Sequence, residues 1–201
     1  MRPADRARFI ASHAALRFIL GEALDLAPAG LRFATGPAGK PDLAGVARGS
    51  VTFNLSHSGA RALIGLAHKT SIGVDIEAVR SLPDALRIAR AHFAADEVSA
   101  LADTPGSAAE RVFFGLWTRK EAVVKALGSG LSLPLDRFSV SVPPARPRLL
   151  RMPAGDPPLD GPWSLADVAC GTDYAATVAV RSAEAAIAVR RLPDAWPDQL
   201  G

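Results

Sequence analysis

The sequence predicts an α+β fold made of two similar α/β halves related by a pseudo-twofold axis, and three observations support this prediction. The chain has 201 residues, of which 49% are hydrophobic and 21% charged, as in an average globular protein. A helical pattern followed by several strand patterns occurs twice along the chain. Residues 60–76 and 174–189 also share one outline, in which a strand, a short turn and a second strand follow each other. The expected halves are residues 1–80 and 81–201.

The first half is expected to open with a helix over residues 4–25. Its apolar stripe is formed by Phe9, Leu16, Ile19, Leu20 and Leu24. His13 and Arg17 interrupt this stretch, so it lacks the unbroken apolar centre of a signal peptide and is assigned to the mature fold. A short strand over 31–34 and a loop over 36–45, rich in glycine and proline, should follow. Three strands complete the half, at residues 51–56, 60–68 and 71–77.

The second half is expected to open with helices over residues 82–101, broken near Ala94 to Asp96. A strong helix pattern begins at residue 108 and stops at the glycines of GSG, 128–130. Five strand patterns follow, at residues 137–142, 146–152, 163–169, 174–180 and 185–192.

Several classes of protein are excluded by composition. The most apolar window, residues 62–67, is far too short to span a bilayer, so no membrane segment is expected. Basic residues do not gather in blocks interleaved with aromatics, so no nucleic-acid partner is expected despite the net charge of +3. Cys170 is the single cysteine, which rules out an intrachain disulfide and suits the reducing cytoplasm.

Two carboxylates share one face of the strand over 71–77. Ile72, Val74 and Ile76 point to one face, whereas Asp75 and Glu77 point to the other. Neighbouring like charges repel each other, so a cation is expected beside them. A solvated polar face is the alternative interpretation of this pair.

A second charged motif, WTRKEAVVKALGSG, begins at Trp117. Glu121 and Lys125 lie four residues apart on one helix face, which also describes an ordinary surface salt bridge. In FNLSHSG, Ser56 and His57 offer donors that suit a phosphate, although a histidine at a strand end is often structural. Lys40 stands in a Gly-Lys-Pro loop, where a solvated lysine is the ordinary case.

Together these motifs indicate a particular kind of site. Three carboxylates, Asp75, Glu77 and Glu121, without histidine or cysteine ligands beside them favour a hard cation, Mg²⁺ before Zn²⁺. The nearby lysines and histidine favour a phosphate-rich ligand. The sequence has neither the G-x-S-x-G elbow of serine hydrolases nor the glycine-rich loops of NTPases and dinucleotide-binding folds.

The order GKP (39–41), FNLSHSG (53–59), IGVDIE (72–77) and WTRKEAVVKALGSGL (117–131) resembles the 4'-phosphopantetheinyl transferases. The resemblance is to their larger, monomeric type, which activates peptide and polyketide synthases, and it runs from about Arg8 to about residue 142. It implies transfer of the 4'-phosphopantetheine arm of coenzyme A to a serine of an apo acyl or peptidyl carrier protein, with release of 3',5'-ADP. Mg²⁺, with Mn²⁺ as the alternative ion, would be the cofactor.

The resemblance also implies roles for individual residues. Asp75, Glu77 and Glu121 would hold the metal ion with the pyrophosphate of coenzyme A, and Lys125 would contact that pyrophosphate. Glu121 would take the proton of the carrier serine, directly or through a water. The remaining contacts to the coenzyme are implied for Ser56, His57, Lys40 and Arg8.

One departure from the family pattern concerns the N-terminus. Family members carry a further strand with basic residues before the first helix, and here the chain starts almost on that helix. A non-catalytic coenzyme A or nucleotide-binding module therefore stays as an alternative, and a small structural or interaction domain as a third. The arginines of residues 86–93 are expected to face an acidic carrier protein.

Overall fold

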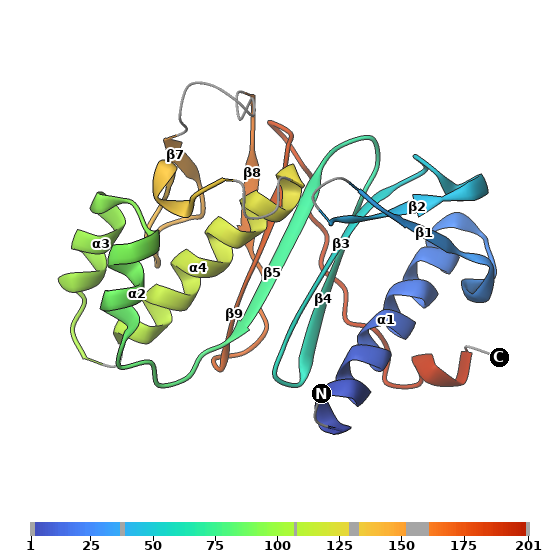
Figure 1. Cartoon of the computed structure of the whole chain (residues 1–201), viewed down its shortest axis with the longest axis horizontal. Coiled ribbons are helices and arrows are strands. Elements are labelled where there is room, and N and C mark those ends of the chain that lie inside the picture. The colour runs from blue at the N-terminus through green and yellow to red at the C-terminus, as the bar shows by residue number, and fades with distance from the viewer. Residues whose placement is uncertain (1–2, 37–38, 107, 129–132, 152–160, 200–201) are drawn as a thin grey trace.

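The computed structural model describes residues 3–36, 39–106, 108–128, 133–151 and 161–199. Figure 1 shows helices and antiparallel strands on either side of a central strand, β5, so the predicted mixed class is confirmed. Helix-then-strands order occurs twice, as expected, with α1 before β1–β5 and α2–α4 before β6–β9. The pseudo-twofold relation and the boundary after residue 80 stay predictions.

The N-terminal group contains one long helix and two hairpins, in which β1 pairs with β2 and β3 with β4. Helix α1 buries Leu16 and Leu20 against Leu43 and Phe53 of these strands. The elements are α1 (Pro3–Leu24), β1 (Arg32–Thr35), β2 (Pro41–Ala44), β3 (Thr52–Ser58) and β4 (Arg61–Ala67).

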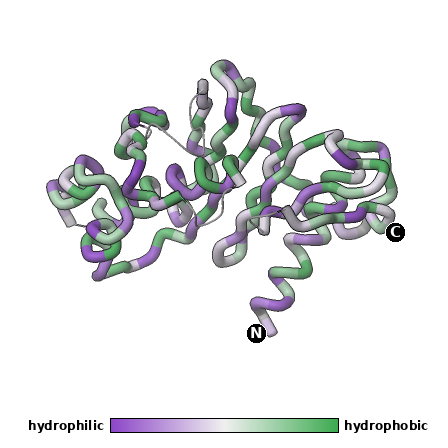
Figure 2. The backbone as a smooth tube through the Cα atoms, turned by 45° about the horizontal axis from the view of Figure 1, so that its top comes forward, coloured by the Kyte–Doolittle hydropathy of each residue, from purple (hydrophilic) through white to green (hydrophobic). Residues whose placement is uncertain are grey.

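Two expectations for this group are corrected. Strand β2 lies inside the predicted loop 36–45, because Leu43 is 1% exposed and anchors a strand whose glycine and proline content had indicated a loop. Phe9 was expected on the buried stripe of α1, but it is 45% exposed and stacks on His13. In Figure 2 the N-terminal turns of α1 project from the rest of the molecule.

A three-stranded antiparallel sheet of order β5-β9-β8 forms the centre of the molecule. Ile72, Val74 and Ile76 of β5 are buried in one apolar cluster with residues of β9. The opposite face of β5 lies against α4, which comes so close that a Cβ at Gly73 would stand 2.1 Å from the carbonyl oxygen of Ala122. The strands are β5 (Ile72–Ala78), β8 (Ser164–Asp167) and β9 (Tyr174–Val180).

The second group packs two short helices and a two-stranded ribbon against α4, whose inner face carries Phe113, Leu116 and Val123. The predicted glycine stop is confirmed by Gly128, which follows the helix with φ +67°. The other residues of the predicted GSG stop lie outside the described residues. The elements are α2 (Ala85–His92), α3 (Ala95–Ala102), α4 (Ala108–Leu127), β6 (Ser139–Val140) and β7 (Leu149–Arg151). Short 3-10 helices span Pro28–Gly30, Gly45–Ala47, Leu135–Arg137 and Trp196–Gln199.

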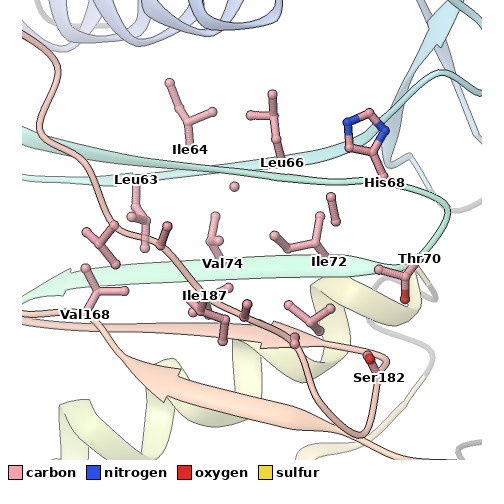
Figure 3. A pocket seen from close by; sticks show the side chains of 18 of the residues that line it. Leu63, Ile64, Leu66, His68, Thr70, Ile72, Val74, Val168, Ser182 and Ile187 are labelled. Carbon is pink, nitrogen blue, oxygen red and sulfur yellow. The ribbon is translucent and has the colours of Figure 1, made fainter. Parts of the chain in front are cut away.

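The strand predicted at 185–192 is wrong. Both edges of β9 are already paired, with β5 and with β8, so this segment has no edge of β9 to join. It crosses an apolar face instead, where Ile187 packs beside Val168, Ile72 and Val74 (Figure 3). Sequence alternation therefore identified an apolar-facing segment but not its lack of strand partners. Among the described residues, no helix combines the length and the apolar character that a membrane crossing needs.

Candidate active site

Asp75 is a buried carboxylate in the middle of β5, only 3% exposed. Its Oδ1 accepts hydrogen bonds from Lys125 Nζ at 2.5 Å and from Ser56 Oγ at 2.9 Å. Its Oδ2 is also buried but has no hydrogen-bond partner in the described part of the chain. A buried oxygen without a partner is costly, so this atom is suited to an additional donor or a cation.

Glu121 and Lys125 occupy successive turns of α4 on the side that faces β5. Burial first, and then the negative charges of Asp75 and Glu77, raise the pKa of Glu121, whereas Lys125 opposes this shift. Lys125 Nζ also reaches Ser56 Oγ at 3.2 Å, which ties α4 to β3 as well as to β5. A carboxyl whose pKa is raised toward neutrality is suited to accept a proton during a reaction.

Glu77 completes the group of carboxylates. Its Oε2 accepts a hydrogen bond from Ser58 Oγ at 2.8 Å and lies 4.0 Å from Arg80. Within the described ranges, no three or more His, Cys, Asp or Glu side chains are arranged as a ready metal site. The fit to Mg²⁺ therefore rests on three observations: the all-oxygen donor set, the carboxylate repulsion that adds to burial in raising the pKa of Glu121, and the Oδ2 of Asp75, which lacks a partner among the described residues.

Ser56 and His57 lie on opposite faces of β3, because neighbouring strand residues alternate. Ser56 is buried against Asp75, whereas His57 is exposed and sits across from Ala62 of β4. The structure thus does not direct the two side chains to one point. Their predicted joint contact with phosphate oxygens stays a prediction.

Lys40 holds the C-terminal end of α4. Its Nζ donates to the carbonyl oxygens of Ile72 at 3.0 Å, Lys125 at 2.8 Å and Ala126 at 3.4 Å. Burial lowers the pKa of Lys40, and Asp42 opposes this effect. The sequence does not predict this role, because carbonyl acceptors at a helix end carry no sequence signature apart from the glycine that follows. The predicted contact of Lys40 with the nucleotide stays a prediction.

Arg8 lies on the exposed part of α1, with its side chain 3.5 Å from Asp5. Its predicted role in binding the coenzyme stays a prediction.

The four charged residues between 119 and 125 point in different directions around helix α4. Glu121 and Lys125 face β5, whereas Arg119 and Lys120 are buried on other sides of the helix. Arg119 pairs with Asp167 at 2.5 Å, and Lys120 pairs with Glu97 at 2.8 Å. The charged motif does not predict these partners, because they lie 23 and 48 residues away in the sequence.

A cavity of about 400 Å³ lies between β4 and the apolar face of β5 and β9, with the segment 185–190 along its wall (Figure 3). It is thus on the opposite face of β5 from Asp75. A smaller cavity of about 260 Å³ adjoins the end of α4, and Lys40, Asp42 and Gly128 are among its lining residues. Neither cavity is lined by Asp75, Glu77 or Glu121.

The chain is similar to known proteins over most of its length. A sequence model described as the 4'-phosphopantetheinyl transferase superfamily matches residues 71–179. The 4'-phosphopantetheinyl transferase HetI of Nostoc sp. is 34% identical, over 89% of this chain and 72% of HetI. The Synechocystis sp. protein slr0495, whose name places it in the same family, is 43% identical over 65% of this chain and 53% of its own length. This chain thus spans about half of that relative.

A solved structure of a holo-(acyl-carrier-protein) synthase from Bacillus anthracis, in complex with coenzyme A (3',5'-ADP), matches with a TM-score of 0.45 and 19% identity. The match covers 55% of this chain and 93% of that one.

Proposed function

The chain belongs to the 4'-phosphopantetheinyl transferase superfamily, and we propose that it transfers the 4'-phosphopantetheine arm of coenzyme A to a serine of an apo carrier protein. Mg²⁺ would be required, and 3',5'-ADP would be released. The observation that carries this proposal is Asp75, a buried carboxylate beside Lys125 and near Glu121, one of whose oxygens has no partner among the residues that the structure describes. All three residues lie inside the segment that the family model matches.

In this proposal Asp75, Glu77 and Glu121 hold the magnesium ion, and Asp75 contributes its unpartnered Oδ2. When bound, Mg²⁺ would neutralise charge on the phosphoryl oxygens of coenzyme A. It would also relieve the carboxylate repulsion that, together with the larger effect of burial, raises the pKa of Glu121. Three oxygen ligands from protein side chains, completed by phosphate oxygens, match the known preference of this ion.

Lys125 would stabilise the diphosphate as the bond to the 3',5'-ADP leaving group breaks. Its side chain is 30% exposed, so the cation is accessible from the solvent side while Asp75 and Ser56 hold it in place. A positioned ammonium near developing negative charge requires little reorganisation during the reaction.

Glu121 is the proposed base. The serine oxygen of the carrier attacks the phosphorus of the phosphopantetheine group, and its proton passes to a Glu121 carboxylate oxygen, directly or through a water. The bond that breaks is the one between this phosphorus and the oxygen of the 3',5'-ADP group. The raised pKa of Glu121 brings its basicity closer to that needed at neutral pH.

The proposed partner is an acidic carrier protein, and the proposed setting is the cytoplasm, with the chain acting as a monomer. Arg87 and Arg90 of α2 are exposed and give this helix two cationic side chains for such a partner. Arg87 also forms an ion pair with Asp84 at 3.0 Å.

The test is a mass measurement on several apo carrier proteins after incubation with this chain, coenzyme A and Mg²⁺. We expect the mass of the phosphopantetheine arm to appear on a carrier, and chelation of Mg²⁺ to prevent it. Glu121→Gln should slow the transfer by about 10²–10⁴-fold, the usual contribution of a general base. Glu110→Gln, the same change in the first turn of α4, is the matched control and should leave transfer unchanged.

A folded chain that modifies none of the carriers would contradict the proposal. If such a chain binds coenzyme A with and without Glu121→Gln, the alternative of a non-catalytic binding module gains support instead.

A further inference from the structure

Strands β3 and β5 lie side by side, yet in the described part of the chain each pairs its main chain with other strands, β3 with β4 and β5 with β9. Side chains make the connection between them. Alternate residues of β3 each accept the main-chain N–H of an alternate residue of β5: Asn54 Oδ1 from Val74 at 2.8 Å, Ser56 Oγ from Ile76 at 3.3 Å and Ser58 Oγ from Ala78 at 3.1 Å. We call these three contacts the side-chain ladder.

The two serines of the ladder share a second feature. Ser56 Oγ donates to Asp75 Oδ1 at 2.9 Å, and Ser58 Oγ donates to Glu77 Oε2 at 2.8 Å. Each hydroxyl therefore accepts the N–H of one β5 residue and donates to the carboxylate of the residue before it. A hydroxyl has a single proton, and the N–H contact occupies a lone pair, so the proton is left for the carboxylate.

We propose that Ser58 is a positioning residue that holds the Glu77 carboxylate in the orientation needed for metal binding, as Ser56 does for Asp75. This inference rests on the proposed function, which assigns both carboxylates to Mg²⁺. Ser58 is half-buried, and the Glu77 side chain is 29% exposed. Without the Ser58 hydroxyl, the Glu77 carboxylate would therefore be free to turn toward solvent or toward Arg80. Removing a group that holds a metal ligand in place commonly weakens metal affinity by about 10- to 100-fold.

Ser58 gives a cleaner test than Ser56. Ser56 also contacts Lys125 at 3.2 Å, so changing it would disturb two proposed functional groups at once. Asn54 supplies the matched control, because its Oδ1 binds the N–H of Val74 in the same ladder. Asn54→Ala thus removes a ladder contact without removing a hydroxyl donor from Asp75 or Glu77.

The experiment is a calorimetric titration of Mg²⁺ into the full chain in the presence of saturating coenzyme A, with thermal melts of every variant. Ser58→Ala should weaken Mg²⁺ binding about 10-fold, the lower end of the usual effect of such groups. Ser58→Thr keeps the hydroxyl and should bind Mg²⁺ nearly as the unmodified chain does. Asn54→Ala should lower the melting temperature and change the Mg²⁺ affinity by less than about twofold, since among the described residues the Asn54 side chain binds the main chain of Val74 and neither carboxylate.

Unchanged Mg²⁺ affinity in Ser58→Ala would overturn the inference, and so would an equal loss in Asn54→Ala, which would assign the effect to the ladder as a whole. If Ser58→Ala does not fold, Ser58→Cys takes its place, because a thiol fills the site but donates only weakly; it should lose most of the same affinity. Mg²⁺ binding by the unmodified chain distinguishes a failure of the proposed function from a failure of the role assigned to Ser58. A chain without Mg²⁺ binding sinks both this inference and the proposed function, whereas normal binding in the chain and in Ser58→Ala sinks the inference alone.

Discussion

Two lysines of α4, five residues apart, end on two very different carboxylates. Lys120 pairs with Glu97 at 2.8 Å, and both side chains are fully buried. Lys125 pairs with Asp75 at 2.5 Å, and its side chain is 30% exposed. Both lysines belong to the same charged motif, so local sequence alone does not tell which one acts on a ligand.

The difference between the pairs lies in how completely their polar atoms are satisfied. Lys120 Nζ also donates to the carbonyl oxygens of Leu135 and Phe138, at 2.8 and 2.6 Å. The two oxygens of Glu97 accept the N–H groups of Val140 and Ala94, at 2.8 and 2.9 Å. We call Lys120 and Glu97 the sealed pair, because the Lys120 nitrogen and both Glu97 oxygens already have partners. We call Lys125 and Asp75 the open pair, because Asp75 Oδ2 has no partner among the described residues. Incomplete satisfaction is thus what distinguishes the proposed site from the core.

The largest effect on stability is expected from breaking the sealed pair. Lys120→Met leaves the Glu97 carboxylate buried without its charge partner, which should lower the free energy of unfolding by about 3–5 kcal/mol. Burial already raises the pKa of Glu97 and lowers that of Lys120, so this pair keeps its charges only through its contacts. Urea unfolding of Lys120→Met beside Lys125→Met measures the contrast. The Lys125 variant should lose less, because water reaches its pair through the Lys125 side chain, which is 30% exposed.

The double variant Glu97→Gln with Lys120→Met is the control for this contrast. It removes both charges, so it should recover part of the stability that Lys120→Met loses. A double variant less stable than the single one would show that the charge left behind is not the cause. A larger loss in Lys125→Met than in Lys120→Met would reverse the assignment of sealed and open pairs.

Most elements of the proposed site could be predicted from sequence, because their signals are local. The alternation in β5 placed Asp75 opposite Ile72 and Val74, and the helical spacing placed Glu121 and Lys125 on one face. The structure brings Asp75 of β5 and Lys125 of α4 into contact. A site in which a carboxylate binds a cation and a lysine binds an anion requires such proximity. The functional roles of these residues stay predictions.

The parts that sequence could not predict depend on contacts between distant segments. Glu97 stands 23 residues before Lys120, and only the packing of α3 against α4 brings them together. The segment 185–192 alternates like a strand, but whether it pairs with one depends on its course across the sheet, which periodicity does not reveal. Ser58 illustrates a third case, because its partner Glu77 follows from the relative register of β3 and β5.

An intermediate effect is expected from a third lysine, Lys40. Its Nζ donates hydrogen bonds to three carbonyl oxygens. Lys40→Met removes the donor to three carbonyls at the end of α4 and the start of β5, and hydrogen bonds to charged groups contribute about 1.5–3 kcal/mol. The free energy of unfolding, measured by urea without coenzyme A, should fall by about that amount in total.

Lys69→Met, a change at an exposed lysine, is the matched control and should leave stability nearly unchanged. Unchanged stability in Lys40→Met, together with weaker coenzyme A binding, would instead favour the nucleotide contact that the family resemblance implies. Loss of stability with unchanged coenzyme A binding would place Lys40 with Lys120, as a structural lysine.

The smallest expected effect concerns the charge of Glu121, which lies near the open pair of Lys125 and Asp75. Because burial, Asp75 and Glu77 raise the pKa of Glu121 above its ordinary value of 4.5, ionising this group opposes folding. The penalty is absent below pH 4.5, grows as pH rises toward the raised pKa, and is complete above it. In metal-free buffer at pH 8, Glu121→Gln should therefore unfold with a free energy higher by less than about 1 kcal/mol, since water screens a partly exposed group.

Urea unfolding at pH 4 and pH 8 tests this sign, because the advantage of Glu121→Gln should be seen at the higher pH and disappear at the lower one. Adding Mg²⁺ with coenzyme A at pH 8 should reverse the order, since the ion offsets carboxylate repulsion and gains a ligand only in the unmodified chain. The sealed pair offers no comparable response, because both of its carboxylate oxygens are already occupied. A Glu121→Gln chain less stable than the unmodified one at pH 8 without metal would mean that Lys125 outweighs the neighbouring carboxylates, and the open pair would then be as self-sufficient as the sealed one.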